Sequence, residues 1–246
     1  MEQKKKNSGP QTMAMLIDGD NARPTLIGKY LTEAGRFGTV SIRRIYGDWT
    51  TNSMNGWKES LHNHAVQPVQ QFRYTVGKNA TDSALIIDAM DVLHGELVEG
   101  FCVVSSDSDY TRLATRIRES GHFVMGIGEE KTPRAFVNAC NVFIYTENLL
   151  DPEASQKRDE TKRRNSKPKP DPTKLLREAF ELAAGDDDWA RLSAIGGHLR
   201  QLDPGFDPRT FGFRQLSQLI RAQNKLFQLR QEDSERPSAI YVRLKD

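Results

Sequence analysis

The chain has 246 residues, which suits two domains better than one or three. Its 35 basic and 33 acidic residues leave a net charge of +2, which excludes a uniformly basic protein that coats nucleic acid by charge alone. Two cysteines exclude a disulfide framework and suit the reducing cytoplasm, where we expect the protein, and the absence of an apolar run of about 18 residues excludes a membrane span.

Composition divides the chain into four parts. Residues 1–12 are predicted to be a disordered tail, and residues 13–150 form a first domain. Residues 151–172 contain no large apolar side chain, so they cannot offset the entropy of ordering and are predicted to be a flexible polar linker. Residues 173–246 regain hydrophobic periodicity and form a second domain.

The first domain alternates short apolar runs with helical patterns. Strands are expected at Met13–Ile17, Thr39–Tyr46, Phe101–Val104, Phe123–Ile127 and Val142–Tyr145. Helices are expected near Pro24–Glu33, Gly56–His64, Ala84–Leu97, Tyr110–Glu119 and Pro133–Asn138. Apolar strands alternating with helices predict an α/β fold whose central, mainly parallel sheet is covered on both faces. In such sheets the functional crevice lies at the carboxyl ends of the strands.

Acidic residues are concentrated at these strand ends. Asp18 and Asp20 follow the first strand, and Asp107 and Asp109 follow the strand that ends at Val104. If both strands are central, four carboxylates meet at one edge of the sheet. A fifth, Asp82, falls on the apolar stripe of its helix, which is formed by Leu85, Ile86, Ala89 and Leu93.

Carboxylates gathered in this way repel one another, and a divalent cation is the usual compensation. Oxygen ligands select a hard ion, so we expect Mg²⁺ or Mn²⁺. Each residue also has a structural alternative, because Asp82, Asp107 or Asp109 could cap the helix that follows it. Asp20 or Asn21 could simply shape a turn.

Three segments of the first domain together resemble the NYN family of PIN-like ribonucleases. They are LIDGDN (Leu16–Asn21), GKNATDSALIIDAMD (Gly77–Asp91) and VVSSDSDYTRLATRIRESGHFVMGIG (Val103–Gly128), within a resemblance that covers roughly residues 13–148. The resemblance implies a three-layer PIN-like fold and metal-dependent hydrolysis of RNA. Ser106 stands where the family usually has glycine, and its Cβ is expected to shift the next aspartate slightly.

Carried over by motif, the resemblance implies two groups of site residues. The catalytic metal ligands would be Asp18, Asp82, Asp107 and Asp109. The residues that support them or position water would be Asp20, Asn21, Asp88 and Ser105. Bound ions would lower the pKa of a water molecule and neutralise the charge that develops on the phosphate and the leaving oxygen.

Four further residues of this domain are candidates for contact with RNA. Arg73 and Lys78 precede the helix of Asp82 and could meet phosphates, or could belong to a solvated loop. Trp49 and Trp57 lie in a polar segment and could stack on unpaired bases, or could anchor that segment to the domain.

The second domain has the pattern of a winged helix. Helical spacing recurs over residues 175–183, 188–202 and 211–223, and alternating strand patterns follow at residues 227–231 and 239–244. It resembles the LOTUS (OST-HTH) domain in Leu192-Ser193, Ile195-Gly196, Phe206, Phe211-Gly212-Phe213 and Leu216–Ile220. The resemblance implies an RNA-binding or protein-docking module.

Basic residues recur around the third helix of this domain and in the expected wing. Arg209, Arg214, Arg221 and Lys225 are candidate RNA contacts near the helix, and an ordinary solvated helix face is the alternative. Arg230 and Arg236 in the wing share this ambiguity. Residues 14–150 hold 13 basic and 16 acidic residues, a net of −3, whereas each remaining part is net positive.

The sequence therefore predicts a metal-dependent endoribonuclease that acts on single-stranded or structured RNA. One alternative is an RNA-binding adaptor that keeps the fold without catalysis. Another is a phosphatase of the haloacid dehalogenase type, with Asp18 as nucleophile and Asp20 as acid. The sequence leaves open whether a protein binds the second domain and whether the chain forms a homo-oligomer.

Overall fold

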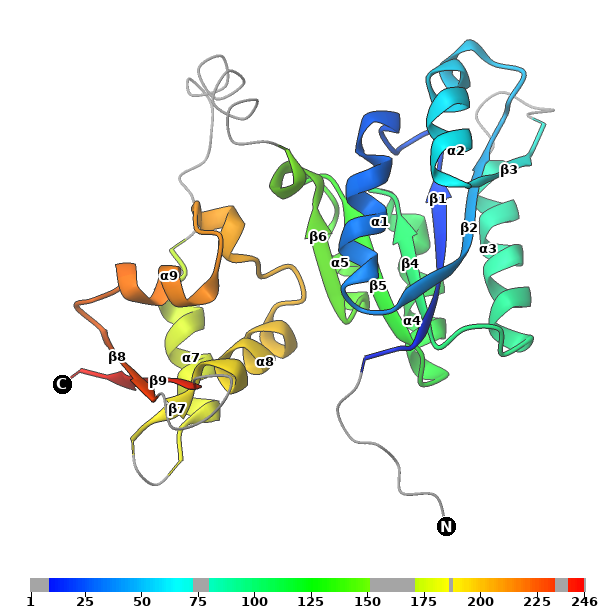
Figure 1. The fold of residues 1–246 in the computed structure, drawn as a ribbon. Coiled ribbons are helices and arrows are strands. Elements are labelled where there is room, and N and C mark those ends of the chain that lie inside the picture. Colours follow the sequence, from blue (N-terminus) through cyan, green and yellow to red (C-terminus); the bar gives the residue numbers. More distant parts are fainter. Residues whose placement is uncertain (1–8, 73–79, 151–170, 186–187, 233–238, 246) are drawn as a thin grey trace. The chain divides into compact units, whose positions relative to one another are not determined.

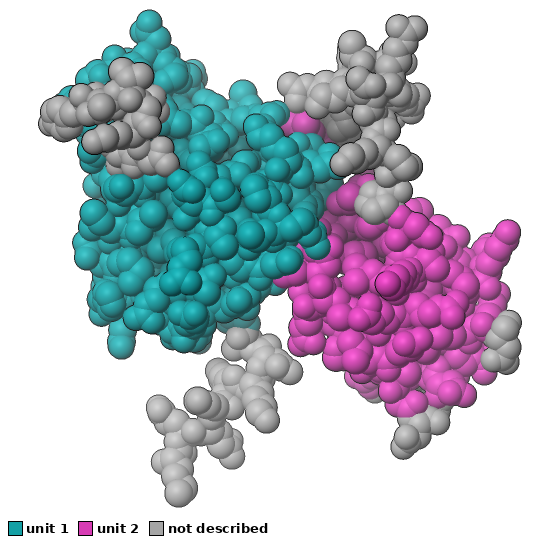
Figure 2. Space-filling view, turned by 180° about the vertical axis from the view of Figure 1, so that it is seen from behind, with its two compact units in different colours: residues 1–149 teal, residues 150–246 magenta. Residues whose placement is uncertain are grey.

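A computed structural model describes residues 9–72, 80–150, 171–185, 188–232 and 239–245. The chain divides into two compact units, residues 1–149 and residues 150–246, which Figure 2 shows in different colours. Most of the expected tail and linker lies outside the described residues, as do Arg73, Lys78 and Arg236. None of the helices within the described ranges is both long and apolar enough to cross a membrane.

Unit 1 is built on a six-stranded sheet with the order β3-β2-β1-β4-β5-β6 (Figure 1). Every neighbouring pair is parallel, which confirms the predicted fold class. The strands are β1 (Thr12–Asp18), β2 (Thr39–Gly47), β3 (Gln67–Gln70), β4 (Gly100–Val104), β5 (Phe123–Gly128) and β6 (Val142–Tyr145).

Helices cover both faces of this sheet and complete three layers. They are α1 (Ile27–Gly35), α2 (Lys58–His64), α3 (Ala80–His94), α4 (Thr111–Glu119) and α5 (Arg134–Ala139). Helices α1 and α2 contact each other on one face, in front of the sheet in Figure 1. Residues of α3, α4 and α5 share one hydrophobic cluster with β1 and β4 on the opposite face.

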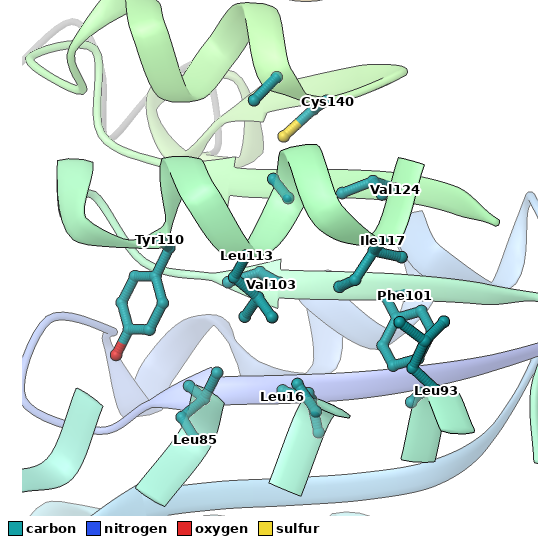
Figure 3. Close-up of a cluster of buried hydrophobic side chains, with 14 of the residues drawn as sticks. Leu16, Leu85, Leu93, Phe101, Val103, Tyr110, Leu113, Ile117, Val124 and Cys140 are labelled. Carbon is teal, nitrogen blue, oxygen red and sulfur yellow. The ribbon is translucent and has the colours of Figure 1, made fainter. Parts of the chain in front are cut away.

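That hydrophobic cluster fixes the position of α3 and α4 over the strands. Leu16 of β1 and Val103 of β4 are fully buried, and so is Leu85 of α3 (Figure 3). Leu113 and Ile117 of α4, which covers the same face of the sheet as α3, belong to the same cluster. Since β1 and β4 are buried on both faces, they contain apolar residues at nearly every position.

The edge strand β3 has no counterpart among the predicted strands. Its residues Gln67, Pro68, Val69 and Gln70 are exposed or only partly buried, and β2 is its one neighbour among the described strands. A proline is tolerated there because an edge strand leaves one side of its backbone unpaired. The strand is therefore set by its neighbour β2 rather than by its own composition.

Unit 2 is a winged-helix fold with a three-stranded antiparallel sheet in the order β7-β9-β8. Its elements are α7 (Thr173–Ala183), β7 (Ala190–Arg191), α8 (Leu192–Leu202), α9 (Leu216–Ala222), β8 (Phe227–Glu232) and β9 (Ala239–Leu244). The core joins the three helices to the sheet through Leu176, Phe180, Leu199, Ile220 and Val242.

The predicted wing had two strands, and the structure adds a third. Ala190 and Arg191 were expected to begin a helix at residue 188, but they pair with Val242 and Tyr241 of β9. A two-residue strand of this kind is stabilised by a partner some fifty positions away, so local periodicity does not reveal it.

Candidate metal centre

The candidate site lies where strands β1 and β4 end side by side. The strand order runs from β1 outward in both directions, so the connections diverge at this point of the sheet. Asp18 is the last residue of β1, and Ser105 directly follows β4. A diverging pair of parallel strands opens a crevice at their carboxyl ends, which is where open α/β sheets bind ligands.

Asp18 is held by a tight turn that requires glycine at position 19. The Gly19 amide donates to the Tyr46 carbonyl oxygen at 2.9 Å. A Cβ on Gly19 would stand 2.7 Å from that oxygen and 2.6 Å from Cε of Met54. Any other residue would push the turn away from β2 and displace the Asp18 carboxylate.

The Asp18 carboxylate is completely buried and receives three hydrogen bonds. Asn21 Nδ2 donates at 2.7 Å, Ser105 Oγ at 2.9 Å and the Asp20 amide at 3.1 Å. Burial raises the pKa of Asp18, the Asn21 and Ser105 bonds oppose this effect, and the charge of Asp82 adds to it.

Three other carboxylates form an acidic cluster, which we define as Asp82, Asp107 and Asp109. One oxygen of each lies within 4.8 Å of the others. Asp82 also accepts a hydrogen bond of 2.7 Å from the Tyr110 hydroxyl, which points from the start of α4 toward α3 (Figure 3). Burial raises the pKa of Asp82, and the charges of Asp107 and Asp109 raise it further, against the Tyr110 bond.

The aspartates that follow β4 also organise their own loop. Asp107 Oδ1 accepts the Asp109 amide at 2.9 Å, so Asp107 caps the helical turn that follows it. It therefore has the structural role as well as its place in the acidic cluster. Ser105 links the cluster to Asp18, because its Oγ donates to Asp18 and accepts the Asp107 amide at 3.1 Å. Ser106 Oγ accepts the Glu129 amide at 2.8 Å, a bond that glycine at this position could not make.

The residues of this edge fit a divalent cation. The acidic cluster offers oxygen atoms only, which is the donor set of hard ions such as Mg²⁺ and Mn²⁺. Burial and mutual repulsion raise the pKa of Asp82, and a bound cation would oppose both effects by compensating the negative charge of the carboxylates. Asp18 stands beside the cluster and is coupled to it through Ser105 and through the charge of Asp82.

The structure does not bring Asp88 into the acidic cluster, although the sequence pattern assigned it a supporting role there. Asp88 follows Asp82 by six residues, or about 9 Å along a helix. Its carboxylate instead accepts bonds from Arg44 and from the Tyr46 hydroxyl of β2. Asp88 therefore ties α3 to the sheet. Asp20 is exposed, yet its charge still raises the pKa of Asp82.

The two tryptophans expected near the site differ in exposure. Trp57 is buried, and its Nε1 donates to the Gly19 carbonyl oxygen at 3.3 Å, so it anchors its segment and offers no face for base stacking. Trp49 is half-buried, and its Nε1 donates to the Val69 carbonyl oxygen at 3.0 Å. The anchoring alternative is thus the correct one for Trp57.

Sequence reasoning missed Tyr110, although it directly follows the SDSD motif and its hydroxyl holds a candidate ligand. It also missed an ion pair between Arg23 and Glu129 that joins the loops after β1 and β5. No local pattern indicates this pair, since the two residues are 106 positions apart. Glu129 has a lowered pKa because Lys131 and Arg23 both donate to its carboxylate.

The basic residues predicted near the third helix of unit 2 have unequal surroundings. Arg209 donates to the Asp207 carboxylate at 2.7 Å and is half-buried, which favours a structural role. The side chains of Arg214, Arg221 and Lys225 are exposed and remain candidate contacts.

Two family models match the chain, one over each unit. A family model described as NYN domain matches residues 12–150, and one described as OST-HTH/LOTUS domain matches residues 163–239. No curated protein matches the chain. A solved protein of unknown function from Vibrio parahaemolyticus shares 15% identity at a TM-score of 0.48, covering 60% of this chain and 98% of that one. An uncharacterized protein from Nitrosomonas europaea shares 31% identity at a TM-score of 0.29, covering 33% and 83%. The chain belongs to the NYN domain family, and an OST-HTH/LOTUS domain follows its NYN domain in the sequence.

Proposed function

We propose that this protein is a metal-dependent endoribonuclease that hydrolyses RNA phosphodiester bonds with Mg²⁺ or Mn²⁺. The observation that carries the proposal is the acidic cluster at the diverging strand ends, with its oxygens within 4.8 Å and buried Asp18 beside it. Membership of a family of PIN-like nucleases supports it. Two buried free thiols, Cys102 and Cys140, suit a reducing cytoplasm.

In this proposal the three carboxylates of the cluster hold the cation, and Asp18, which the family resemblance implied as a fourth ligand, lies beside them and adds its negative charge. Such an ion, when bound, makes a water molecule more acidic and stabilises the charge that develops on the phosphate. Tyr110 fixes the orientation of Asp82, and Ser105 fixes the spacing between Asp18 and the loop of Asp107. Complete burial of Asp18, with both oxygens bonded, argues against its use as a phosphatase nucleophile.

The OST-HTH/LOTUS domain supplies RNA affinity in this proposal. Because both domains belong to one chain, RNA bound by the second domain stays at high local concentration near the first. The substrate would be single-stranded or structured RNA, and a protein partner of the second domain remains compatible with the same arrangement.

The test is cleavage of end-labelled RNA and DNA pools by the purified chain in Mn²⁺, Mg²⁺, Ca²⁺ or EDTA. We expect internal cuts in RNA with Mn²⁺ or Mg²⁺ and none in EDTA. Asp107→Asn should reduce the rate by more than about a hundredfold, the upper range for loss of a residue that only supports a metal ligand, because Asp107 would hold the ion itself. Asp91→Asn, on the exposed side of the same domain, is the control and should cleave normally.

Intact RNA under every metal condition, with RNA bound equally well by the wild type with and without Mn²⁺, would support the adaptor alternative. Equal activity of Asp107→Asn and the wild type would instead remove the acidic cluster from the reaction. End mapping of the products separates internal cleavage from removal of terminal nucleotides.

A further inference from the structure

The outer face of the sheet in unit 2 carries an unusual combination of side chains. Phe227 and Val242 point into the core, so the residues that alternate with them face outward. On the register of β8 and β9, Gln228 lies opposite Arg243, and Arg230 lies opposite Tyr241. A sheet with one packed face normally carries scattered polar residues on the other, whereas this one carries arginines and an aromatic ring.

Four close contacts connect these arginines with two aromatic rings. The Arg230 guanidinium lies 4.8 Å from the ring centre of Trp189 and 5.5 Å from that of Tyr241. Arg243 lies 5.2 Å from the Trp189 ring, and Arg191 lies 5.6 Å from the Tyr241 ring. Arg191 Nε also donates to the Tyr241 hydroxyl at 3.2 Å. The five side chains, which we call the aromatic-arginine face, come from all three strands and the residue before β7.

A cavity of about 330 Å³ borders this face. It is lined by Asp188, Gln228, Arg243, Leu244 and Lys245. Its volume is at the lower end of the range of ~300–1,000 Å³ for small-ligand pockets. Two cations, a carboxylate and an amide belong to this lining, and the half-buried side chains of Trp189 and Tyr241 leave part of their surface to solvent.

We propose that the aromatic-arginine face binds single-stranded RNA. Trp189 and Tyr241 would stack with unpaired bases, while Arg191, Arg230 and Arg243 would contact phosphates. This inference rests on the RNA affinity that the proposed function gives to the second domain, and it assigns that affinity to the sheet rather than to α9. It does not depend on catalysis by the first domain.

The chemistry of the face favours single strands over duplexes. Stacking needs bases that are free to leave a helix, and a base–aromatic contact contributes about 1–3 kcal/mol by alanine substitution. Arginine serves both partners, because its planar group stacks on a ring and its N–H groups bind phosphate oxygens. Holding the arginines against rings also limits the side-chain entropy lost on binding.

The test measures binding of fluorescein-labelled 12-nucleotide single-stranded RNA to the full chain in EDTA, by fluorescence anisotropy. The double variant Arg230→Ala/Arg243→Ala should weaken binding at least about tenfold, within the range given by loss of a stacking and phosphate contact. The competing surface is tested with Arg214→Ala/Arg221→Ala, which removes the same charge from the candidate contacts near α9. It should weaken binding less than about threefold.

Aromatic stacking is tested separately, with Trp189→Phe and Trp189→Ala. Phenylalanine should retain most of the affinity and alanine should lose it, with thermal unfolding confirming that each variant is folded. If Trp189→Ala does not fold, the arginine pair still decides the question. A duplex of the same sequence should bind more weakly than the single strand.

Equal losses from the two arginine pairs, or a larger loss from the α9 pair, would overturn the proposed face. Duplex binding as tight as single-strand binding would overturn it as well. If the wild type binds RNA and every variant of the sheet binds it with the same affinity, only this inference fails. If wild-type protein binds no RNA, the targeting part of the proposed function fails with it, whereas the cleavage assay still tests the metal centre.

Discussion

Asp18 and Asp82 both have raised pKa values, but they differ in how many hydrogen bonds stabilise the ionised carboxylate. Asp18 is fully buried and compensated by three donors, so its carboxylate is fixed in place. Within the described residues Asp82 has one hydrogen-bond donor, Tyr110, and the charges of Asp107 and Asp109 act on it. The Asp82 carboxylate is therefore less well compensated than that of Asp18, so we expect cation binding to change its pKa more.

The first prediction concerns the variant Asp82→Asn without metal. A raised pKa means that the Asp82 carboxyl group keeps its proton to higher pH in the folded chain than in the unfolded chain. The contribution of the protonated group to stability is present below the ordinary value of 3.8 and is lost as the pH rises through the folded-state pKa. At pH 7, metal-free Asp82→Asn should therefore unfold at a higher temperature than the wild type.

Scanning calorimetry in EDTA between pH 3 and pH 8 checks this expectation. The difference between variant and wild type should shrink toward low pH, and the increase in Tm caused by Mn²⁺ should disappear in the variant. Asp91→Asn, an exposed position on the same helix, should show neither effect. A lower Tm of metal-free Asp82→Asn at neutral pH would contradict the electrostatic interpretation.

The second prediction concerns Tyr110→Phe, which keeps the buried ring and removes the donor to Asp82. Loss of this bond should raise the pKa of Asp82 further, because the bond stabilises the ionised form. Protons then compete with the cation at higher pH. Mn²⁺ affinity at pH 7 should fall about tenfold, the lower range for residues that orient a metal ligand.

Calorimetric titration with Mn²⁺ at several pH values measures this effect. The pH at which half of the affinity is lost should move upward in Tyr110→Phe. Tyr30→Phe serves as a control, since the buried Tyr30 hydroxyl accepts the Arg23 amide rather than donating to Asp82. A uniform loss at all pH values would indicate a steric cause instead.

At the scale of elements, the segment between β2 and α2 is anchored by one side chain. Trp57 ends a short 3₁₀ helix, Asn52–Trp57, and its ring is 1% exposed. Met54 from the same turn packs against Gly19 and Gly47, where a Cβ atom would collide with its side chain. The segment therefore supports the turn that carries Asp18, although it contains no candidate ligand.

The third prediction contrasts Trp57→Ala with Trp49→Ala. Removal of the buried ring should lower the free energy of unfolding by about 3–5 kcal/mol, through lost burial and a residual cavity. Trp49 is half-buried, so its truncation should cost markedly less. Urea unfolding monitored by circular dichroism gives both values. Similar costs for the two variants would show that Trp57 does not anchor the segment.

Most strands and helices of unit 1 could be predicted from the sequence because the spacing of their apolar residues follows their burial. The apolar runs of β1 and β4 follow from burial on both faces, and Leu85, Ala89 and Leu93 mark the inner side of α3. The strands β3 and β7 could not be predicted in this way. Their pairing depends on β2 and on β9, which supply the hydrogen bonds that their own sequences do not indicate.

At the scale of the whole molecule, charge is divided between the parts of the chain. Residues 14–150 carry a net charge of −3, with 13 basic and 16 acidic residues, and the site that would hold cations belongs to this part. The second domain is net positive and carries the aromatic-arginine face. We therefore expect RNA affinity and RNA cleavage to be separable functions of the two units.

The fourth prediction follows from the covalent connection between the units. A protease site inserted within residues 151–170 should allow the chain to be cut without touching either described core. Cutting should reduce cleavage of dilute RNA at least about tenfold, because the advantage of local concentration is lost. At saturating RNA the maximal rate should be unchanged. The uncut insertion variant is the control, and an equal loss at every RNA concentration would contradict the model.

The sequence by itself determined the parallel α/β domain, the winged helix that follows it in the chain and the position of the aspartates at the ends of strands. Periodicity and strand-end position suffice for these, since each is a local consequence of burial. The tertiary structure decided which neighbours each aspartate has: it assigned Asp88 to Arg44 and Tyr46, placed Tyr110 on Asp82, and buried Trp57. Such pairings join residues far apart in the chain, and only packing brings them within hydrogen-bond distance.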